Sequence, residues 1–435
     1  MIPKYNRPAA PVSSTYPDGP TATSAAADIH WRDFFTDPRL KRMVELSLKN
    51  NRNLRVAALN VELYEAQYRI QRSALFPTVA ATGSFTRARA EGTTTNEWNV
   101  GVGVVSYELD FFGRLRSLSK EALEIYLASA ETRRSTVISL VADVATQYLT
   151  LLDDQEQLAL AQQTLTSYEG SYQLIKLQFD TGTTNALDLA EAESEVHTAR
   201  VNVFEYQRLA GEALDYLVLE VGEPLPENLP AGRKLVDQGM LADIPAGLPS
   251  DLIARRPDIL AAEHSLLSAN ASIGAARANF FPQITLTGSG GFASAQLSNL
   301  FSASSAVWSV GPSISVPIFN GGENQATLDV AKVNKRIQIA MYEGTVQTAF
   351  REVSDALISR GRYAFEVGAA SDLVAADQKF YDLSMLSYKE GIETYVTVLI
   401  AEEALYTAKS NLITTRTNLL ANLITLYKAL GGGWQ

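Results

Sequence analysis

The most constraining feature of the sequence is a run of 68 residues, Gly113–Asp180, that contains no proline and only one internal glycine, Gly170. Apolar residues recur along it in steps of three and four, which is typical of a heptad seam. If helical throughout, the run is a rod of roughly 100 Å at about 1.5 Å per residue. Because helices of globular domains average only three to four turns, the sequence predicts an elongated, mainly α-helical molecule.

Two other segments replace the helical period with alternation, which is typical of strands. In Thr78–Thr86, apolar residues alternate with Thr and Ser, and the same holds for Trp98–Leu109, with a polar loop (RARAEGTTTNE) expected between them. This predicts a β-hairpin at about 78–109. A second, at about 283–318, includes WSVGPSISVPIFNGG (Trp308–Gly322), where Pro312 lies mid-strand and predicts a bulge or a missing hydrogen bond.

The second half of the chain repeats the first. LFP at 75–77 recurs as FFP at 280–282, Trp98 as Trp308, and FDTG at 179–182 as YKEG at 388–391, all roughly 210 residues apart. Such a period indicates an internal duplication. The prediction is an extended tail (1–37), repeat 1 (38–222), a linker (223–250) and repeat 2 (251–435). Repeat 1 consists of a helix, the hairpin at 78–109, a long helix at 113–180 and a helix at 185–221. Repeat 2 consists of a helix, the hairpin at 283–318, a long helix at 322–390 and a helix at 394–430.

The hairpins have an apolar side with no obvious partner, because the helices run away from them. In a bilayer, lipid solvates such a side, but strand edges must then close. Four strands are too few for an outer-membrane barrel, whereas three chains supply twelve and an open lumen. The residues expected to face lipid are Trp98, Val100, Val102, Val104, Trp308, Val310, Ile314 and Val316. The alternative is a soluble sheet packed on helices.

Composition excludes several classes of protein. The net charge of −11 argues against a nucleic-acid partner. The absence of cysteine excludes disulfides, thiol nucleophiles and cysteine-ligated metals. The sequence contains no run of about 18 apolar residues, so it predicts no transmembrane helix. The N-terminus lacks the plan of a signal peptide, so in an exported protein we expect the signal to have been removed and Met1 to be an added start.

The sequence offers little for catalysis. His30, His197 and His264 are scattered without metal-ligand spacing. Gly288–Gly291 lies inside a predicted strand rather than before a helix, unlike a phosphate loop. The paired carboxylates Asp153 and Asp154 lie mid-helix, where we expect them to be solvated. We therefore expect no enzyme activity, no cofactor and no metal site.

Several longer segments together indicate a family. LPSDLIARRPDILAAEHSLLSANASIGAARANFFPQITLTGS (Leu248–Ser289), YELDFFGRLRS (107–117), NNRNLRVAALNVE (50–62) and LYKALGGGW (426–434) closely resemble the outer-membrane efflux channels, the TolC/OprM-like outer-membrane factors. The likeness covers essentially the whole chain, and it is much closer to the lipoprotein efflux branch of the family than to TolC itself. The opening IPKYNRP resembles the start of mature members, which carry a lipidated cysteine just upstream; no cysteine is present here.

This resemblance implies a homotrimer with a twelve-stranded barrel in the outer membrane of a Gram-negative bacterium, on a twelve-helix periplasmic α-barrel. It also implies a periplasmic adaptor, an inner-membrane resistance–nodulation–division transporter, outer-membrane lipid as surroundings and small-molecule cargo. The expected function is a passive exit duct of a multidrug efflux pump. The same fold serving metal-ion efflux or protein secretion is an alternative, as is a soluble coiled-coil adaptor without a pore.

The resemblance also places the family's gate and adaptor contacts at the helical turns Thr181–Leu189 and Glu390–Ile400. Asp188 matches an acidic gate position and Val396 an apolar ring, whereas Thr397 and Ile400 stand where relatives often carry acids, so the tightest ring here is expected to be apolar. The expected adaptor contacts are Gly182, Thr183, Thr184, Asn185, Gly391, Ile392, Glu393 and Thr394. Helix capping explains single residues of this set equally well. Glu402 and Glu403 could add negative potential or form a solvated face.

Overall fold

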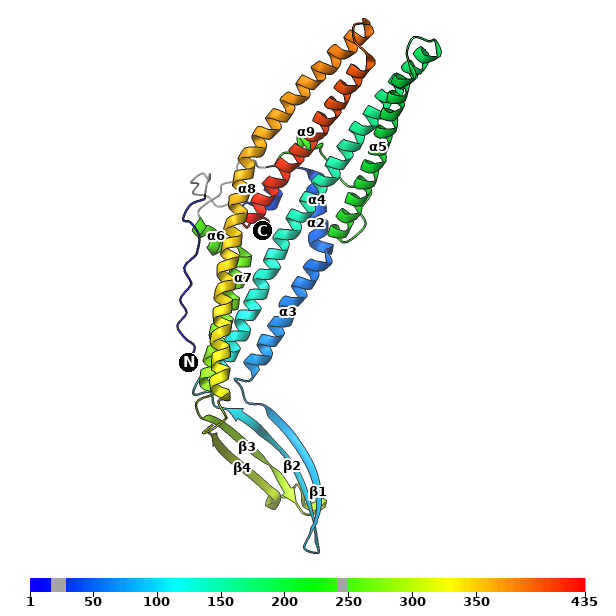
Figure 1. Cartoon of the computed structure of the whole chain (residues 1–435). Helices are drawn as coiled ribbons and strands as arrows, with labels where there is room; N and C mark the ends of the chain where they lie inside the picture. The colour runs from blue at the N-terminus through cyan, green and yellow to red at the C-terminus, as the bar shows by residue number, and fades with distance from the viewer. Residues whose placement is uncertain (17–28, 241–248, 435) are drawn as a thin grey trace. The chain divides into compact units, whose positions relative to one another are not determined.

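The structure of the chain, a computed structural model, describes residues 1–16, 29–240 and 249–434 (Figure 1). Parts of the predicted tail (17–28) and linker (241–248) lie outside the described residues. The chain divides into two compact units. Unit 1 comprises residues 1–10, 58–132 and 258–345, and unit 2 comprises residues 11–57, 133–257 and 346–435.

Unit 1 contains a single antiparallel sheet in the order β1-β2-β3-β4 among the described residues. Its strands are β1 (Val79–Ala90), β2 (Thr93–Glu108), β3 (Gln283–Ser294) and β4 (Ala306–Ser315). The two hairpins of the duplicated sequence therefore pair through β2 and β3 (Figure 1). Within the described chain, β1 and β4 are edge strands and the sheet is not closed.

In the first hairpin, most of the segment expected to be a polar loop is strand. Strands β1 and β2 remain paired to the end, from Val79↔Val104 to Ala90↔Thr93. Only Glu91 and Gly92 turn the chain, and both have positive φ angles, 51° and 83°. This is the backbone of a tight two-residue hairpin turn, which extends a two-stranded ribbon beyond the rest of the sheet.

The second hairpin departs from its expected bounds. Its loop carries two short 3₁₀ turns, Leu297–Asn299 and Ala303–Ser305. β4 ends at Ser315, so Val316, expected on the barrel strand, lies beyond it. Pro317 follows directly and has no N–H to donate to a ladder, which ends the strand.

Pro312 pairs with Leu286 in an unbroken β3–β4 register, so of the two expected outcomes the bulge is absent from that ladder, while the proline still has no N–H to donate. The irregularity lies instead in β2, between Val104 and Tyr107, and Tyr107 is the other neighbour of Leu286. Between these two pairs β2 has one more residue than β3, which is a β-bulge next to the residue that pairs with the proline.

Helices and the N-terminal segment complete unit 1. Residues of α7 (Pro257–Ala278) and α8 (Glu323–Lys389) form an apolar contact through Ile273, Ala276, Ala331 and Leu328. The extended N-terminus lies along α7, where the Arg7 Nε donates to Glu263 (2.8 Å), and Tyr5 donates to the same carboxylate (3.0 Å).

In unit 2, the last part of the predicted extended tail is folded rather than extended. Trp31–Phe34 form the short helix α1, and Trp31, Phe34 and Phe35 are buried. The Phe34 ring stacks on Tyr427 with ring centroids 4.1 Å apart. Aromatic burial thus makes the last part of the tail a piece of the core.

Asp37 then begins α2 (Pro38–Asn50), since its carboxylate accepts hydrogen bonds from the N–H groups of Arg39 and Leu40. The same buried carboxylate accepts from Tyr148 (3.0 Å), Gln238 (2.6 Å) and the backbone of Arg233 (2.9 Å). Although burial raises the pKa of Asp37, these donors outweigh it and hold the pKa below its usual value. The linker is thereby fastened to the first helix of repeat 1.

Each repeat opens with two helices where the sequence predicted one. In repeat 1, α2 ends at Asn50 and α3 (Arg52–Ser73) begins after Asn51, whose side chain accepts from the Leu54 N–H and donates to the Glu220 carbonyl. In repeat 2, α6 (Pro249–Arg255) precedes α7, because Pro257 disfavours helical backbone at the residue before it.

The long helices lie within one residue of the predicted bounds. α4 (Arg114–Asp180) and α8 each have 67 residues, α5 (Ala186–Val221) has 36 and α9 (Tyr395–Ala429) has 35. Among the described helices, α4 alone contains an 18-residue window apolar enough to cross a membrane, and half of that window is buried inside the protein. Buried core helices share this property.

Candidate functional site: a two-faced sheet and two helical tips

The register of the sheet gives it two chemically different faces. Directly opposite residues share a face, so the pairs Phe85↔Trp98 and Gly83↔Val100 continue across β3 to β4. The residues of this apolar face are Val79, Ala81, Phe85, Trp98, Val100, Val102, Val104, Ile284, Leu286, Phe292, Trp308, Val310, Pro312 and Ile314. Trp308 is 82% exposed and Val310 and Ile314 are each 65% exposed, so the described chain leaves most of this face uncovered, above all along β4.

The opposite face carries small polar side chains. Ser289 and Ser309 share a hydrogen bond of 2.9 Å, and the Thr287 hydroxyl donates to the Gly311 carbonyl (3.0 Å). Seven of the eight residues that sequence analysis assigned to the apolar side lie within strands and share one face; Val316 is the exception.

Close backbone contact joins the two hairpins. Gly101 pairs with Gly291, and a Cβ added at Gly291 would lie 2.2 Å from the Val100 carbonyl oxygen. A Cβ added at Gly103 would lie 2.6 Å from the Gly288 carbonyl oxygen. By contrast, a Cβ at Gly290 meets nothing within 4 Å. At the β2–β3 junction, glycine is therefore sterically required on the small polar face of the sheet, at Gly103 and Gly291, but not at Gly290 on the apolar face.

The second candidate region consists of the two helical tips, the turns between α4 and α5 and between α8 and α9. Both turns have the same cap. Gly182 (φ 76°) and Gly391 (φ 71°) are left-handed, and the N–H groups of Thr183 and Ile392 reach back five residues to Gln178 and Ser387. This Schellman geometry favours glycine at the left-handed position.

The tips differ in how the next helix begins. In repeat 1, Asn185 caps α5 by accepting from the N–H groups of Leu187 and Asp188 (2.8 and 3.1 Å). The Asp188 carboxylate in turn accepts from the Thr184 hydroxyl and the Asn185 amide. In repeat 2, Thr394 makes no side-chain cap. Three of the tip residues of repeat 1 are thus joined in one hydrogen-bonded capping cluster.

The expected gate residues of repeat 2 share the first turns of α9 but differ in exposure. Val396 and Thr397 are half-buried, and the Thr397 hydroxyl donates to Glu393 (3.2 Å). Ile400 is 56% exposed, and Ile392 at the turn is 75% exposed. The tip therefore presents apolar side chains that the described chain leaves uncovered.

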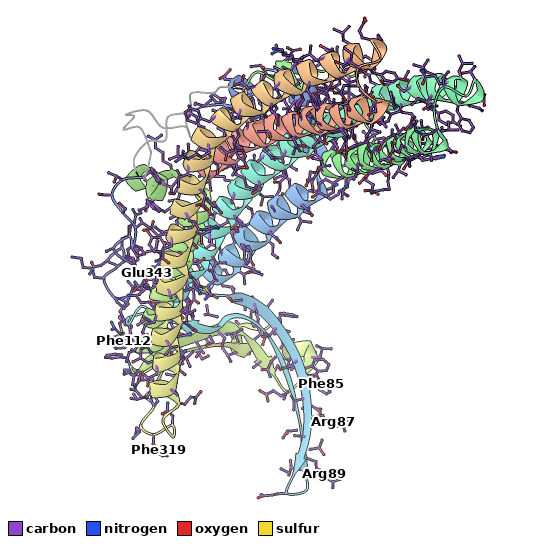
Figure 2. The ribbon with its side chains drawn as sticks, turned by 45° about the horizontal axis from the view of Figure 1, so that its top comes forward. Phe85, Arg87, Arg89, Phe112, Phe319 and Glu343 are labelled. Atoms are coloured by element: carbon purple, nitrogen blue, oxygen red, sulfur yellow. The ribbon has the colours of Figure 1, made fainter. Side chains whose placement is uncertain are left out.

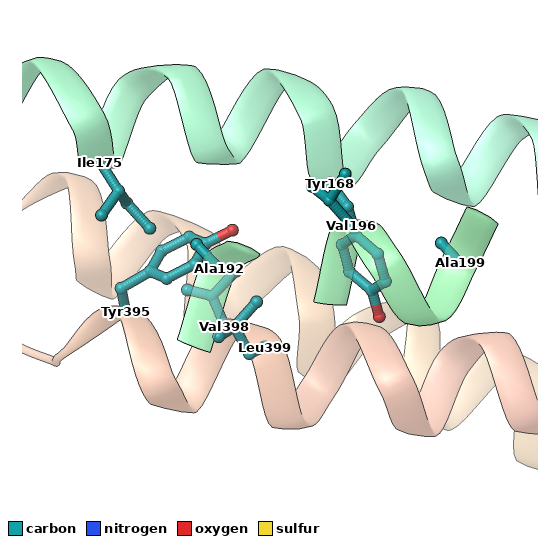
Figure 3. Packing of buried hydrophobic residues seen from close by; sticks show 8 residues of the cluster. All are labelled: Tyr168, Ile175, Ala192, Val196, Ala199, Tyr395, Val398 and Leu399. Atoms are coloured by element: carbon teal, nitrogen blue, oxygen red, sulfur yellow. The ribbon is translucent and has the colours of Figure 1, made fainter. Parts of the chain in front are cut away.

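A hydrophobic cluster supports the tips from below, with residues from α4, α5 and α9 (Figure 3). Its buried members are Tyr168, Ile175, Ala192, Val196, Ala199, Tyr395, Val398 and Leu399. Tyr388 of α8 packs against it, and its hydroxyl donates to Gln178 of α4 (2.9 Å). The two helical hairpins are therefore held together close to their turns.

A buried carboxylate, which sequence analysis missed, lies next to this cluster. Glu402 is only 7% exposed, not on a solvated face, and its Oε2 has no hydrogen-bond partner among the described residues. Burial, and secondarily the charge of Glu195, raise the pKa of Glu402. No signal in a helical heptad distinguishes a buried glutamate from an exposed one, because only the packing partner decides.

Asp154 is a second correction. Both carboxylates were expected to be solvated, but Asp153 accepts a hydrogen bond from the Thr417 hydroxyl (2.7 Å), and Asp154 is only 8% exposed. Burial, followed by the charges of Asp153 and Glu212, raises the pKa of Asp154 to about 6. The pair therefore lies in the packing of α4 rather than on a solvated face.

Known proteins resemble the chain over its whole length. Residues 43–223 and 248–432 match the outer membrane efflux protein family. The toluene efflux pump outer membrane protein TtgC of Pseudomonas putida is 46% identical, covering all of this chain and 92% of that protein. Outer membrane protein OprJ of Pseudomonas aeruginosa is 41% identical, covering all of this chain and 93% of that protein.

A solved structure resembles the fold equally closely. The open state of the MtrE outer membrane channel of Neisseria gonorrhoeae superimposes with a TM-score of 0.94 at 39% sequence identity, covering all of this chain and 98% of that one. The fold, the two-faced sheet and these likenesses agree, and the chain belongs to the family of outer membrane efflux proteins.

Proposed function

We propose that the chain is the outer-membrane exit duct of a multidrug efflux pump and conducts small molecules passively. The observation that carries this proposal is the sheet with one exposed apolar face, one small polar face and two edge strands. In a bilayer the apolar face suits lipid and the polar face suits a water-filled lumen, but the edges must be paired.

Three chains satisfy this requirement. If β1 of one protomer pairs with β4 of the next, three four-stranded sheets close into a twelve-stranded barrel, wider than the side-chain-filled interior of eight strands. The long helices α4, α5, α8 and α9 of each protomer then supply twelve helices for a periplasmic tunnel. The chain supplies no energy and performs no reaction; a pump in the inner membrane drives transport.

Partners and cargo follow from the relatives. TtgC is named as part of a toluene efflux pump, and the equally similar ArpC of Pseudomonas putida as part of an antibiotic efflux pump. We infer a periplasmic adaptor and an inner-membrane resistance–nodulation–division transporter as partners, and small apolar or antibiotic molecules as cargo.

The tips are the proposed gate and docking site. Asp188 forms a ring of three carboxylates in the trimer. Val396 and Ile400, with the uncharged Thr397 between them, form the constriction, whose apolar side chains close it by excluding water. The adaptor contacts the turns through Gly182, Thr183, Thr184 and Asn185, and Gly391, Ile392, Glu393 and Thr394. Support comes from the exposed Ile392 and Ile400 and from glycine turns that let a partner approach the backbone.

Restoring efflux in living cells tests this function. A Pseudomonas strain that lacks its own outer-membrane duct, but retains the pump and adaptor, is given this gene, and its susceptibility to toluene and antibiotics is measured. We expect resistance to rise several-fold with the gene and not with an empty vector. Unchanged susceptibility despite normal amounts of the protein in the outer membrane would contradict the proposal.

A further inference from the structure

We propose that Arg87 and Arg89 form a phosphate-binding site for the phosphorylated glycolipid, lipopolysaccharide, of the outer membrane's outer leaflet. This proposal rests on the proposed function, because it takes the apolar face of the sheet as lipid-facing. Figure 2 shows Phe85, Arg87 and Arg89 following one another along β1 toward its turn. The two arginines belong to the segment expected to be an irregular polar loop, and no role for them follows from conduction.

The register places both arginines on the apolar face. Phe85 is paired with Trp98, and the next residues of the same parity are Arg87, paired with Asn96, and Arg89, paired with Thr94. Side chains of one parity share a face, so the apolar column of β1 continues without a break into two guanidinium groups. Both are exposed, and they are flanked across the hairpin by an amide and a hydroxyl.

The topology decides which leaflet they meet. β1 begins after α3 and β2 leads into α4, so the turn at Glu91–Gly92 lies at the end of the hairpin away from these helices. The last five β1–β2 pairs extend beyond Trp98↔Ser294, the final β2–β3 pair, as a two-stranded ribbon. With the helices in the periplasm, this ribbon reaches the outer leaflet.

The depth agrees with a headgroup position. Val79 and Arg87 are separated by about 27 Å along the strand at ~3.4 Å per residue, or roughly 20 Å along the membrane normal at the usual tilt of about 40°. Arg89 lies about 5 Å farther out by the same geometry. The apolar band of such barrels is about 25 Å tall. With Val79 placed at its inner edge, Arg87 and Arg89 lie on either side of its outer edge, and the tilted ring pair of Phe85 and Trp98 (centroids 4.2 Å apart) lies just inside it.

Charge complementarity selects the ligand. Among the described residues no ion pair or side-chain hydrogen bond joins Arg87 or Arg89 to a carboxylate, in contrast to Arg114, whose Nε donates to Glu108 (2.9 Å). Glu97 pairs with Thr86 and therefore points to the opposite face. Two uncompensated guanidinium groups about 7 Å apart along a strand are suited to the phosphates of a glycolipid, because guanidinium matches phosphate bidentately.

Lipid binding to the detergent-purified full-length protein tests the proposal by native mass spectrometry. The probes are bisphosphorylated lipid A, the same lipid after enzymatic removal of its phosphates, and inorganic phosphate as competitor. We compare the wild type with R87Q/R89Q, with R87K/R89K, and with the control R336Q/R362Q, which removes two exposed arginines from α8. The phosphate competitor distinguishes a lipid site from a site for the free ion.

We expect R87Q/R89Q to bind bisphosphorylated lipid A at least tenfold more weakly, R87K/R89K to retain most of the affinity, and R336Q/R362Q to match the wild type. The dephosphorylated lipid should bind all variants equally weakly, and millimolar phosphate should not compete. Equal binding by R87Q/R89Q and the wild type, or binding indifferent to the lipid's phosphates, would overturn the proposal. Channel conductance, measured on the same preparations, tests the duct function separately. A wild-type protein that binds the phosphorylated lipid but forms no channels would refute the proposed function and not the lipid site.

Discussion

At the scale of single residues, Asp154 makes stability depend on pH. Its pKa is raised to about 6 by burial and by the neighbouring Asp153 and Glu212, so the folded state binds a proton more tightly than the unfolded chain. The associated stability is fully present at pH values below the ordinary aspartate pKa and is lost as pH rises through about 6. The loss amounts to about 3 kcal/mol at one pKa unit per ~1.4 kcal/mol.

We therefore expect Asp154→Asn to stabilise the protein at pH 7.5 and to have little effect at pH 4, measured as the free energy of unfolding in detergent. Asp215→Asn, at an exposed position of α5, serves as control and should change little at either pH. If Asp154→Asn instead destabilised the protein equally at both pH values, the carboxylate would be an essential hydrogen-bonding group rather than a buried charge.

Single residues are also where sequence analysis was least reliable. The alternation of Trp98, Val100 and Val102 was visible because a strand repeats every two residues. The burial of Glu402 and Asp154 was not visible, since a long helix packs several faces against different neighbours. The turn at Glu91–Gly92 was hidden by Arg87–Glu97, whose polar composition is typical of a loop although its backbone is strand.

At the scale of elements, the junction of β2 and β3 depends on glycine. We expect Gly291→Ala to prevent stable barrel formation, because its Cβ would overlap the Val100 carbonyl oxygen, whereas Gly290→Ala should assemble normally. Heat-resistant trimers on a mild detergent gel measure assembly for both variants. Equal amounts of trimer would mean that the β2–β3 contact relaxes at no appreciable cost.

The gate prediction also belongs to this scale, because the tips open as helical turns. We expect Ile400→Gly to raise single-channel conductance several-fold by widening the apolar constriction. Asp188→Ala should raise it as well, but that change also removes the acceptor of the Thr184 and Asn185 hydrogen bonds.

Asp188→Asn separates the two roles of Asp188, since an amide keeps an acceptor oxygen and loses the charge. If a ring of charge closes the pore, Asn and Ala should open it equally. If the capping cluster sets the tip, Ala alone should do so. Unchanged conductance in all three variants would place the gate elsewhere.

The elements themselves were largely predictable. Long helices without proline, alternating strands and the repeated glycine turns have strong local signals, so α4, α5, α8 and α9 lie within one residue of expectation. Breaks set by tertiary contacts were missed, as at Asn51, whose side chain binds the end of α5, and at α1, whose aromatic residues are core.

At the scale of the whole molecule, the chain leaves an apolar sheet face and two strand edges without cover among its described residues. An exposed apolar face and an unpaired strand edge are both costly in water. When three chains close a barrel in a membrane, lipid covers the apolar face and the strand edges pair with one another. No single element shows this; it follows from the register that joins the two repeats. The sequence indicated the duplication, but only the register shows which residues share a face.

The most direct test is the electrical conductance of the purified protein in a planar lipid bilayer, combined with its subunit number in detergent by light scattering. The account predicts a detergent-requiring trimer that forms discrete ion-conducting channels, with smaller conductance steps for the wild type than for Ile400→Gly. A protein that is monomeric and soluble without detergent, and that yields no channels in the bilayer, would contradict it.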